Sequence, residues 1–423
     1  MRLQGKLLAA GVAAALSLGV MAAPAAEAAK PTIVIWADAA HAPGLRAAAK
    51  NYTAALVKVV TYTKDIRANI KTVALKDAPD IIEGAHDWVG ELSSNASIVA
   101  MSLPAPIKSQ FDADDLSAMT YNGNLYGLPM LHESLAFVIN TDMVGTTCPT
   151  TLSGFLAKAN TVSGLTTPIQ VTNDPYHFFP MLSGLGGYFF KRITSGSNKG
   201  GYLIPRAGQI NKNLDTAKAV GFDSDALLRN ASVIEGWRTS ALFQRYTGNA
   251  NALNGLFSQK KAAAWITGPW NATNLLTMAT RKVNPIKMKQ CKFPTIVTGI
   301  KSVPFRGIRG LMITKYANQH GVLAAAKALV TTRYATKEAQ STYGKVGGFN
   351  AANKKASGSS NPFVKGFMVA YADAPPMPNI PQMASVWNNG NSCWSKTLKA
   401  TGYDSVASAF GAVANAIRSD IAG

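Results

Sequence analysis

Short runs of consecutive apolar residues recur along the chain and alternate with longer amphipathic segments. Five runs have the length and the β-branched or aliphatic character of buried strands: residues 32–36, 80–82, 135–139, 262–266 and 311–314. A continuous apolar run of this length, bounded by Gly, Pro or polar residues, is typical of a strand that is buried on both faces. We therefore expect sheets with helices packed against both sides.

Helical segments are expected between these strands. Residues 46–57 and 322–332 are Ala-rich stretches that read as helices. The clearest helix is the last one, because five apolar residues recur on one face and either Asp404 or Ser405 is available as the N-cap. The apolar residues of that face are Val406, Phe410, Val413, Ile417 and Ile421. Residues 351–360 are small and polar and predict a surface linker. Strands alternating with helices predict an α/β protein.

The first 28 residues have the pattern of a secretory signal peptide. Arg2 and Lys6 precede an uncharged apolar run over residues 7–21, and an Ala-x-Ala site ends at Ala28. The run is short for a bilayer span, which takes about 20 residues, although an N-terminal membrane anchor is the alternative interpretation. No cysteine follows the run, so the sequence offers no lipid-anchor position. We expect an exported protein, periplasmic or at the extracellular face.

Composition narrows the function classes further. The 423 residues are 47% hydrophobic, which excludes a disordered chain and predicts two or three domains. The formal net charge is +20, yet no run of five Lys or Arg occurs, so we expect a solvated cationic surface and no nucleic-acid partner. Cys148, Cys291 and Cys393 allow three single disulfides, and the sequence does not choose among them. The five His form no His-x-x-x-His pair, and we expect no metal and no cofactor.

Acidic and aromatic residues stand together in the loops at predicted strand ends. Asp87 follows the strand at 80–82, Glu133 precedes the strand at 135–139, and Trp270 follows the strand at 262–266; Asp174-Pro175-Tyr176 lies in another loop. A neutral sugar offers hydroxyls to carboxylates and its C–H face to an aromatic ring. Taken singly, each acid could be a cap and each ring could be core. Together they favour a carbohydrate site at the carboxyl ends of the strands.

Three segments resemble the maltose/maltodextrin-binding proteins, the extracellular receptors of ABC sugar importers. They are Pro-Asp-Ile-Ile-Glu-Gly-Ala-His-Asp at 79–87, Thr-Gly-Pro-Trp at 267–270, and Met-Pro-Asn-Ile-Pro-Gln-Met at 377–383 followed by Trp387. The resemblance covers essentially the whole chain after residue 28. It implies a two-lobe α/β periplasmic-binding-protein fold of type II, with discontinuous lobes joined by a hinge. The first lobe would hold residues 29–133 and 309–356, and the second would hold 134–308 and 357–423.

The resemblance also implies a set of ligand-binding residues, which we carry over by motif. Asp87, Glu133 and Asp174 would accept sugar hydroxyls, Tyr176, Trp270 and Trp387 would stack on sugar rings, and Met377 and Ala85 would line the cleft. The family's Asp-Lys pair after the first strand is replaced by Asp38-Ala39-Ala40-His41, where Asp38 is the available substitute. A family Trp is Gly84 here, and two family Arg are Trp88 and Asn391, although Trp88 offers a ring from a neighbouring position.

The resemblance implies a monomeric receptor, not an enzyme, that captures a maltose- or maltodextrin-type oligosaccharide and delivers it to a membrane permease. Because three charged or stacking contacts differ from the family pattern, a second hypothesis keeps the receptor and changes the cargo to trehalose, another disaccharide or a non-sugar solute. A remote third hypothesis is a glycoside hydrolase, in which two of Asp87, Glu133 and Asp174 would flank the scissile bond.

Overall fold

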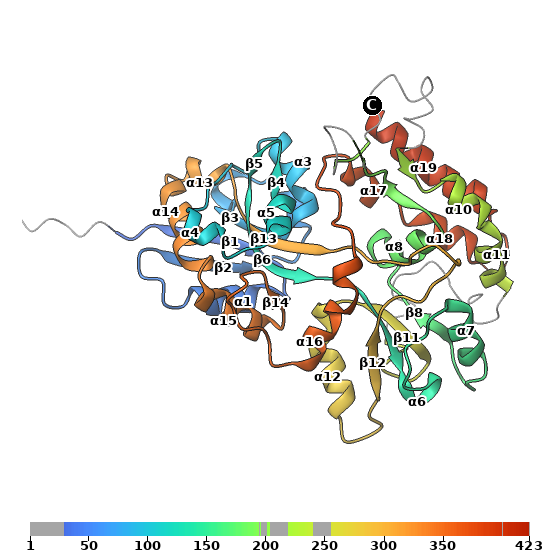
Figure 1. Cartoon of the computed structure of the whole chain (residues 1–423). Coiled ribbons are helices and arrows are strands. Elements are labelled where there is room, and N and C mark those ends of the chain that lie inside the picture. The colour runs from blue at the N-terminus through green and yellow to red at the C-terminus, as the bar shows by residue number, and fades with distance from the viewer. Residues whose placement is uncertain are drawn as a thin grey trace, which may run out of the picture. The chain divides into compact units, whose positions relative to one another are not determined.

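The computed structural model describes residues 29–193, 195, 201–203, 219–239, 255–399 and 401–422. The predicted signal peptide at 1–28 lies outside the described residues. From Pro31 onward the elements form one unit of contacts, which is built on two separate β-sheets with helices on their faces (Figure 1). This α/β architecture agrees with the fold class expected from the sequence.

The larger sheet has six strands and mixes parallel and antiparallel pairs. Strand β1 (Thr32–Ala37) pairs in parallel with β2 (Leu56–Thr61) and β3 (Ile81–Ala85), and β13 (Gly307–Ile313) runs antiparallel between β3 and β6 (Gly127–Glu133). The order across the sheet is β14 (Asn350–Ala351), β6 (Gly127–Glu133), β13 (Gly307–Ile313), β3 (Ile81–Ala85), β1 (Thr32–Ala37) and β2 (Leu56–Thr61). The late strand β13 is thus inserted beside strands from the first third of the chain.

The smaller sheet has four strands. Their order is β12 (Met288–Cys291), β7 (Ala136–Asn140), β11 (Ala262–Thr267) and β8 (Thr167–Gln170). Two further pairs are β9 (Tyr188–Phe190) with β10 (Val220–Gly221), and β4 (Thr120–Tyr121) with β5 (Asn124–Leu125). Only two residues separate β6 in the large sheet from β7 in the small one, so the chain passes between the sheets directly after Glu133.

Helices surround both sheets. The helices up to α8 are α1 (Ala42–Ala49), α2 (Ile66–Asn69), α3 (Val89–Ser94), α4 (Ala105–Lys108), α5 (Ala113–Ala118), α6 (Thr141–Val144), α7 (Leu152–Asn160) and α8 (Pro175–Gly184). The later ones are α10 (Asp225–Arg229), α11 (Ala231–Thr239), α12 (Ala272–Thr280), α13 (Tyr316–Gln319), α14 (Leu323–Ala328), α15 (Lys337–Gly347), α16 (Pro362–Gly366), α17 (Met383–Asn389), α18 (Ser392–Thr397) and α19 (Val406–Ala422). Short 3₁₀ segments are η1 (Leu75–Asp77), η2 (His86–Trp88), η4 (Pro269–Asn271) and η6 (Phe367–Asp373), and η5 (Leu329–Tyr334) is a π-helix.

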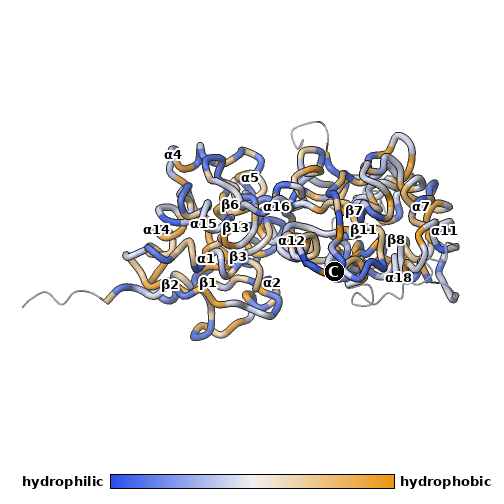
Figure 2. Tube along the Cα trace, turned by 90° about the horizontal axis from the view of Figure 1, so that it is seen from below, coloured by the Kyte–Doolittle hydropathy of each residue, from blue (hydrophilic) through white to orange (hydrophobic). Residues whose placement is uncertain are grey.

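The apolar strand runs are buried on both faces, as their sequence predicts. In β1, Ile33 and Ile35 join the core under α1 and α15, whereas Trp36 joins the core on the opposite face beside α3. In β7, Phe137 and Ile139 pack in the largest core, and Ala136 and Val138 face a second core with α12 and α16. Figure 2 shows apolar and polar residues interleaved along the trace. Across the described part of the chain, no helix combines the length and apolar character that crossing a bilayer requires.

Three sequence expectations for local structure need correction. The helix expected at 46–57 is α1, which begins earlier at Ala42, ends at Ala49 and is followed by strand β2. The β-branched residues of β2 explain the switch, because they pair in parallel register with β1. The helix expected at 322–332 begins at Leu323 and continues into the π-helical η5.

The segment 351–360 is a surface linker only in part, with Lys354, Lys355, Ser357 and Ser360 exposed. Ala351 pairs with β6, and Asn353 is buried, donating from its side-chain amide to the carbonyl oxygen of Ala335 and to Gln110 Oε1. Asn353 therefore has a buried hydrogen-bonding role, whereas Ser357 and Ser360 are exposed. For the last helix, the N-cap left open between two residues is resolved, since Ser405 Oγ accepts from the backbone N–H of Ser408.

The membership of strands and core residues shows where the chain crosses from one half of the fold to the other. Strand β12 belongs to the small sheet and β13 to the large one, and after β14 the chain enters the cores beside the small sheet at Val364 and Met377. The predicted lobe bounds at 133/134, 308/309 and 356/357 stay a prediction at the level of individual residues. Within the small-sheet half, Cys148 and Cys291 form a disulfide and Cys393 is a buried free thiol.

Candidate functional site

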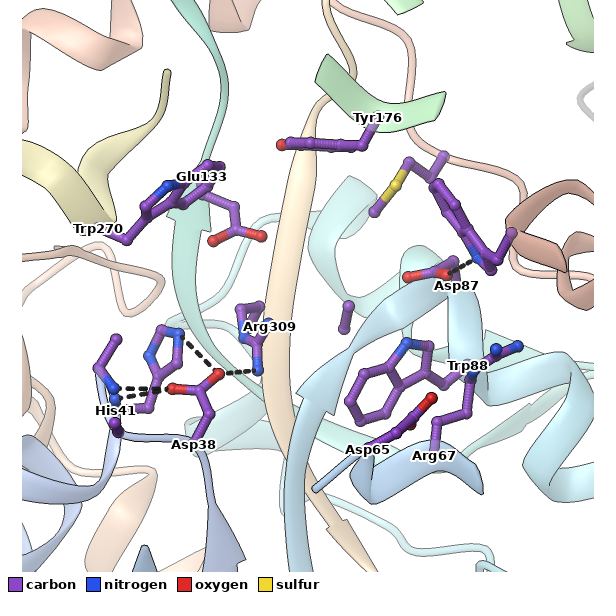
Figure 3. Close-up of a pocket in the computed structure, with 15 residues that line it drawn as sticks. Asp38, His41, Asp65, Arg67, Asp87, Trp88, Glu133, Tyr176, Trp270 and Arg309 are labelled. Carbon is purple, nitrogen blue, oxygen red and sulfur yellow. Dashed lines mark hydrogen bonds and ion pairs between the residues drawn. The ribbon is translucent and has the colours of Figure 1, made fainter. Parts of the chain in front are cut away.

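Loops and helix starts around both sheets enclose a cavity of about 720 Å³, a volume typical of small-molecule sites (Figure 3). Nine of the ten residues predicted to bind ligand line it: Asp38, Ala85, Asp87, Trp88, Glu133, Tyr176, Trp270, Met377 and Trp387. Six lining residues were not predicted: Ala39, Ala40, His41, Asp65, Arg67 and Arg309. The structure thus brings together segments that are far apart in the sequence, while their role in binding stays a prediction.

Asp174 is the predicted residue that lies outside the cavity lining. It is the N-cap of α8, where Oδ1 accepts the backbone N–H of His177 at 2.8 Å and Oδ2 contacts His177 Nδ1 at 2.7 Å. Both carboxylate oxygens are therefore engaged within the first turn of the helix. The capping role, which the sequence left open, is what the structure shows, and a role of Asp174 as hydroxyl acceptor stays a prediction.

One aromatic wall consists of Trp270 and Tyr176. A Cβ on Gly268 would lie 2.3 Å from the Trp270 ring, so the glycine of the Gly-Pro-Trp turn lets the indole fold back over the backbone. The two ring centroids are 6.2 Å apart, and both side chains are half-buried. The Tyr176 hydroxyl is buried and has no hydrogen-bond partner among the described residues. A buried, unpaired hydroxyl is costly unless another group meets it, as a ligand would.

Trp88 supplies a ring on the wall next to β3. The glycine at position 84 makes this possible, since a Cβ there would lie 2.3 Å from two atoms of the Trp88 ring. An indole from four residues further on thus lies where position 84 itself carries no ring. The sequence predicted a ring from this neighbouring position, and Trp88 does line the cavity, while its role as a stacking surface stays a prediction.

Asp87 and Trp387 meet directly across the cavity. Asp87 lies in η2 after β3 of the large sheet, and Trp387 lies in α17, whose Met383 and Val386 belong to the core around the small sheet. The indole Nε1–H of Trp387 donates to Asp87 Oδ2 at 2.9 Å. Burial raises the pKa of Asp87 to about 6, and the hydrogen bond from Trp387 opposes this shift. The bond joins the two halves of the fold at the cavity.

Glu133, the last residue of β6, presents its carboxylate to the cavity. Its backbone pairs with Gly307, where a Cβ would lie 2.5 Å from Glu133 Cγ, so the glycine makes room for this side chain. Glu133 is 6% exposed, and burial together with the charge of Glu83 raises its pKa to about 7, against the influence of Arg309. No hydrogen bond joins this carboxylate to another side chain drawn in Figure 3.

Arg309 on β13 is the central cation of the cavity. Its Nε and Nη2 each donate to one oxygen of the fully buried Glu83 at 2.7 Å, and Nη2 also donates to Asp38 Oδ2 at 2.9 Å. Because Arg309 pairs with Ala85 and Glu83 pairs with Leu311 across the antiparallel ladder, Glu83 and Arg309 share one face of the sheet. Burial opposes the charged form, but Glu83 and Asp38 outweigh it and raise the pKa of Arg309 well above its usual value.

Asp38, His41 and Glu83 lie close enough together to suggest a metal site, but their chemistry points elsewhere. Both carboxylates are already ion-paired with Arg309, and His41 Nδ1 is 2.9 Å from the Tyr343 hydroxyl. Burial and the nearby Arg309 lower the pKa of His41 to about 3, so the ring is neutral. Asp38 Oδ1 also accepts the backbone N–H groups of Ala40 and His41, which fixes the loop after β1. The cluster is an ion-paired scaffold for Arg309.

The chemistry of the cavity lining would suit a neutral, polyhydroxylated molecule. Three indoles and a phenol offer flat apolar faces, while the carboxylates of Asp87 and Glu133 and the guanidinium of Arg309 offer hydrogen bonds in both directions. With two α/β halves around a central cavity, the fold is that of a two-lobe solute-binding protein.

Comparison with known proteins gives the family. The family model described as "bacterial extracellular solute-binding protein" matches residues 45–366, and the chain belongs to this family. The maltodextrin-binding protein of Bacillus subtilis (strain 168) is 26% identical over 325 residues, covering 75% of this chain and 72% of that protein. A maltooligosaccharide ABC transporter solute-binding lipoprotein of Streptococcus pneumoniae (strain R6) is 25% identical, covering 84% and 81%. The galactooligosaccharide-binding protein of B. subtilis is 22% identical, covering 85% and 83%.

Proposed function

We propose that this protein binds a neutral oligosaccharide of the maltose or maltodextrin type in its central cavity and delivers it to the permease of an ABC importer. The observation that carries the proposal is the cavity itself, where aromatic rings from both halves of the fold face carboxylates at strand ends. Two of the named relatives bind maltodextrin or maltooligosaccharide according to their names, which supports an α-linked glucose oligosaccharide as the first candidate ligand.

Several features support the rest of the proposal. The Cys148–Cys291 disulfide suits an exported protein, because disulfides persist in oxidising compartments. The Trp387–Asp87 hydrogen bond spans the cavity, so a ligand that contacts both sides would favour the closed arrangement over an open one. We propose a monomeric receptor with no catalytic step, and incubation with labelled maltodextrin should return the glycan uncut.

Calorimetry with maltotriose is the direct test, and we expect binding at a 1:1 stoichiometry. The variant Trp270→Ala should bind at least tenfold more weakly, because it removes the ring that packs beside Tyr176. Trp265→Ala is the matched control: Trp265 lies on the neighbouring strand β11, packs against Phe257 and is not a cavity residue. Equal affinity of the wild type and Trp270→Ala would reject the assigned site.

The galactooligosaccharide-binding relative keeps a second cargo open. A thermal-shift panel of maltose, maltotriose, trehalose and galactooligosaccharides separates the possibilities, since a ligand at 100 times its dissociation constant adds about 2.7 kcal/mol of stability. We expect the largest shift from an α-glucan. A thermal shift confined to trehalose or to galactooligosaccharides would support the receptor function and contradict the α-glucan as its ligand.

A further inference from the structure

The guanidinium of Arg309 has donors that the protein itself does not use. Of its five N–H groups, Nε–H and the two N–H of Nη2 serve Glu83 and Asp38. Nη1 makes no hydrogen bond to any residue within the described ranges, and Arg309 lines the cavity. Figure 3 shows the guanidinium between Asp38 and Glu133, in the middle of the residues drawn. Two N–H groups on one rigid, planar cation are therefore available to a cavity ligand.

The surroundings hold this cation in one orientation. Glu83, which accepts the forked pair of hydrogen bonds from Arg309, has no solvent exposure. Asp38, in the loop after β1, accepts a further hydrogen bond from the same Nη2. The Trp88 ring lies 5.9 Å from the guanidinium carbon and adds a cation–π contact. A donor anchored on two strands and a loop is preorganised, so little conformational entropy is lost when a ligand accepts from it.

The charge balance selects the acceptor. Asp38 and Glu83 together carry more negative charge than Arg309 neutralises, and Glu133 lies beside them. A carboxylated or phosphorylated sugar would face this negative excess, whereas a neutral hydroxyl oxygen can accept from Nη1 without that repulsion. The available donors thus suit a pair of neighbouring hydroxyls on an uncharged pyranose.

We propose that Arg309 is a specificity-determining residue that donates from Nη1 to hydroxyl oxygens of a neutral sugar, with Glu83 and Asp38 as the residues that position it. The inference rests on the proposed sugar-binding function. In this role Arg309 would take the place of the family's lysine after the first strand, which this chain lacks. Arg309 lies on β13, more than 270 residues after Asp38.

The test compares maltose with its monodeoxy analogues by calorimetry. The variant Arg309→Lys keeps a charge for Glu83 but has no second nitrogen to offer, and Arg309→Met with Glu83→Gln removes both charges in case the lysine variant folds poorly. Arg418→Lys is the matched control, because Arg418 forms a fork with Asp223 and is not a residue of this cavity.

We expect the wild type to lose at least tenfold in affinity for the analogue that lacks the recognised hydroxyl. Both Arg309 variants should bind maltose at least tenfold more weakly, yet lose less than twofold further with that same analogue, while Arg418→Lys should behave as the wild type. Penalties that are equal in the wild type and the Arg309 variants for every analogue would reduce Arg309 to a structural residue and overturn the inference. A wild type that binds no sugar would instead overturn the proposed function, and this role with it.

Discussion

Replacing Arg309 by Met should destabilise the protein by about 3–5 kcal/mol, even without a ligand. The substitution removes the guanidinium that forks to the Glu83 carboxylate, which has no solvent exposure, and removing one member of a buried ion pair costs about this much. Chemical denaturation of the ligand-free protein measures the effect. A loss below about 1 kcal/mol would mean that Glu83 is not buried with Arg309 as described.

The double variant Arg309→Met with Glu83→Gln isolates the cause. It removes the unpaired charge along with its partner, and a buried pair replaced by neutral groups of similar size is often close to neutral in stability. We therefore expect it to recover most of the loss, whereas Arg309→Met with Asp38→Asn should recover little, because Asp38 is partly exposed and water can solvate its carboxylate. Equal recovery by both double variants would contradict this assignment.

The strands and Trp270 could be predicted because each leaves a local signal in the sequence. The apolar run at 135–139 reads as a buried strand from its composition alone, and the observed strand β7 differs from it by one residue at each end. Trp387 was expected only from the resemblance of its motif, whereas Trp270 follows the predicted strand at 262–266. Gly268 illustrates this well, since the ring position depends on a glycine only two residues away.

Arg309 and Glu83 were missed because their meaning depends on topology. Each is a lone charged residue in an otherwise apolar strand, and the two are 226 residues apart. One signal was available, because a charge next to a buried strand needs an opposite partner: Glu83 directly follows the strand predicted at 80–82, and Arg309 lies two residues before the strand predicted at 311–314. Only the insertion of β13 beside β3 shows that they are partners. Asn353 is a similar case. It lies in a stretch of small, polar residues, so the sequence alone does not show that it is buried and hydrogen-bonded to Ala335.

The stability of the protein should also depend on pH through Glu133. Burial raises the pKa of this carboxyl from its ordinary 4.5 to about 7 in the folded protein, so the folded state binds the proton more tightly than the unfolded state does. The contribution of Glu133 to the free energy of unfolding is therefore highest below pH 4.5 and falls as the pH rises through about 7. At about 1.36 kcal/mol per pKa unit, the total change is about 3 kcal/mol.

Glu133→Gln removes this titration while keeping the side-chain size. Because other groups such as Asp87 titrate in the same range, the quantity to measure is the difference in unfolding free energy between variant and wild type at each pH. We expect that difference to shift by about 3 kcal/mol in favour of the variant between pH 4.5 and pH 8. Glu338→Gln, on the exposed side of α15, controls for the amide substitution itself. A difference that stays constant with pH would show that Glu133 is not held in the buried environment from which its high pKa follows.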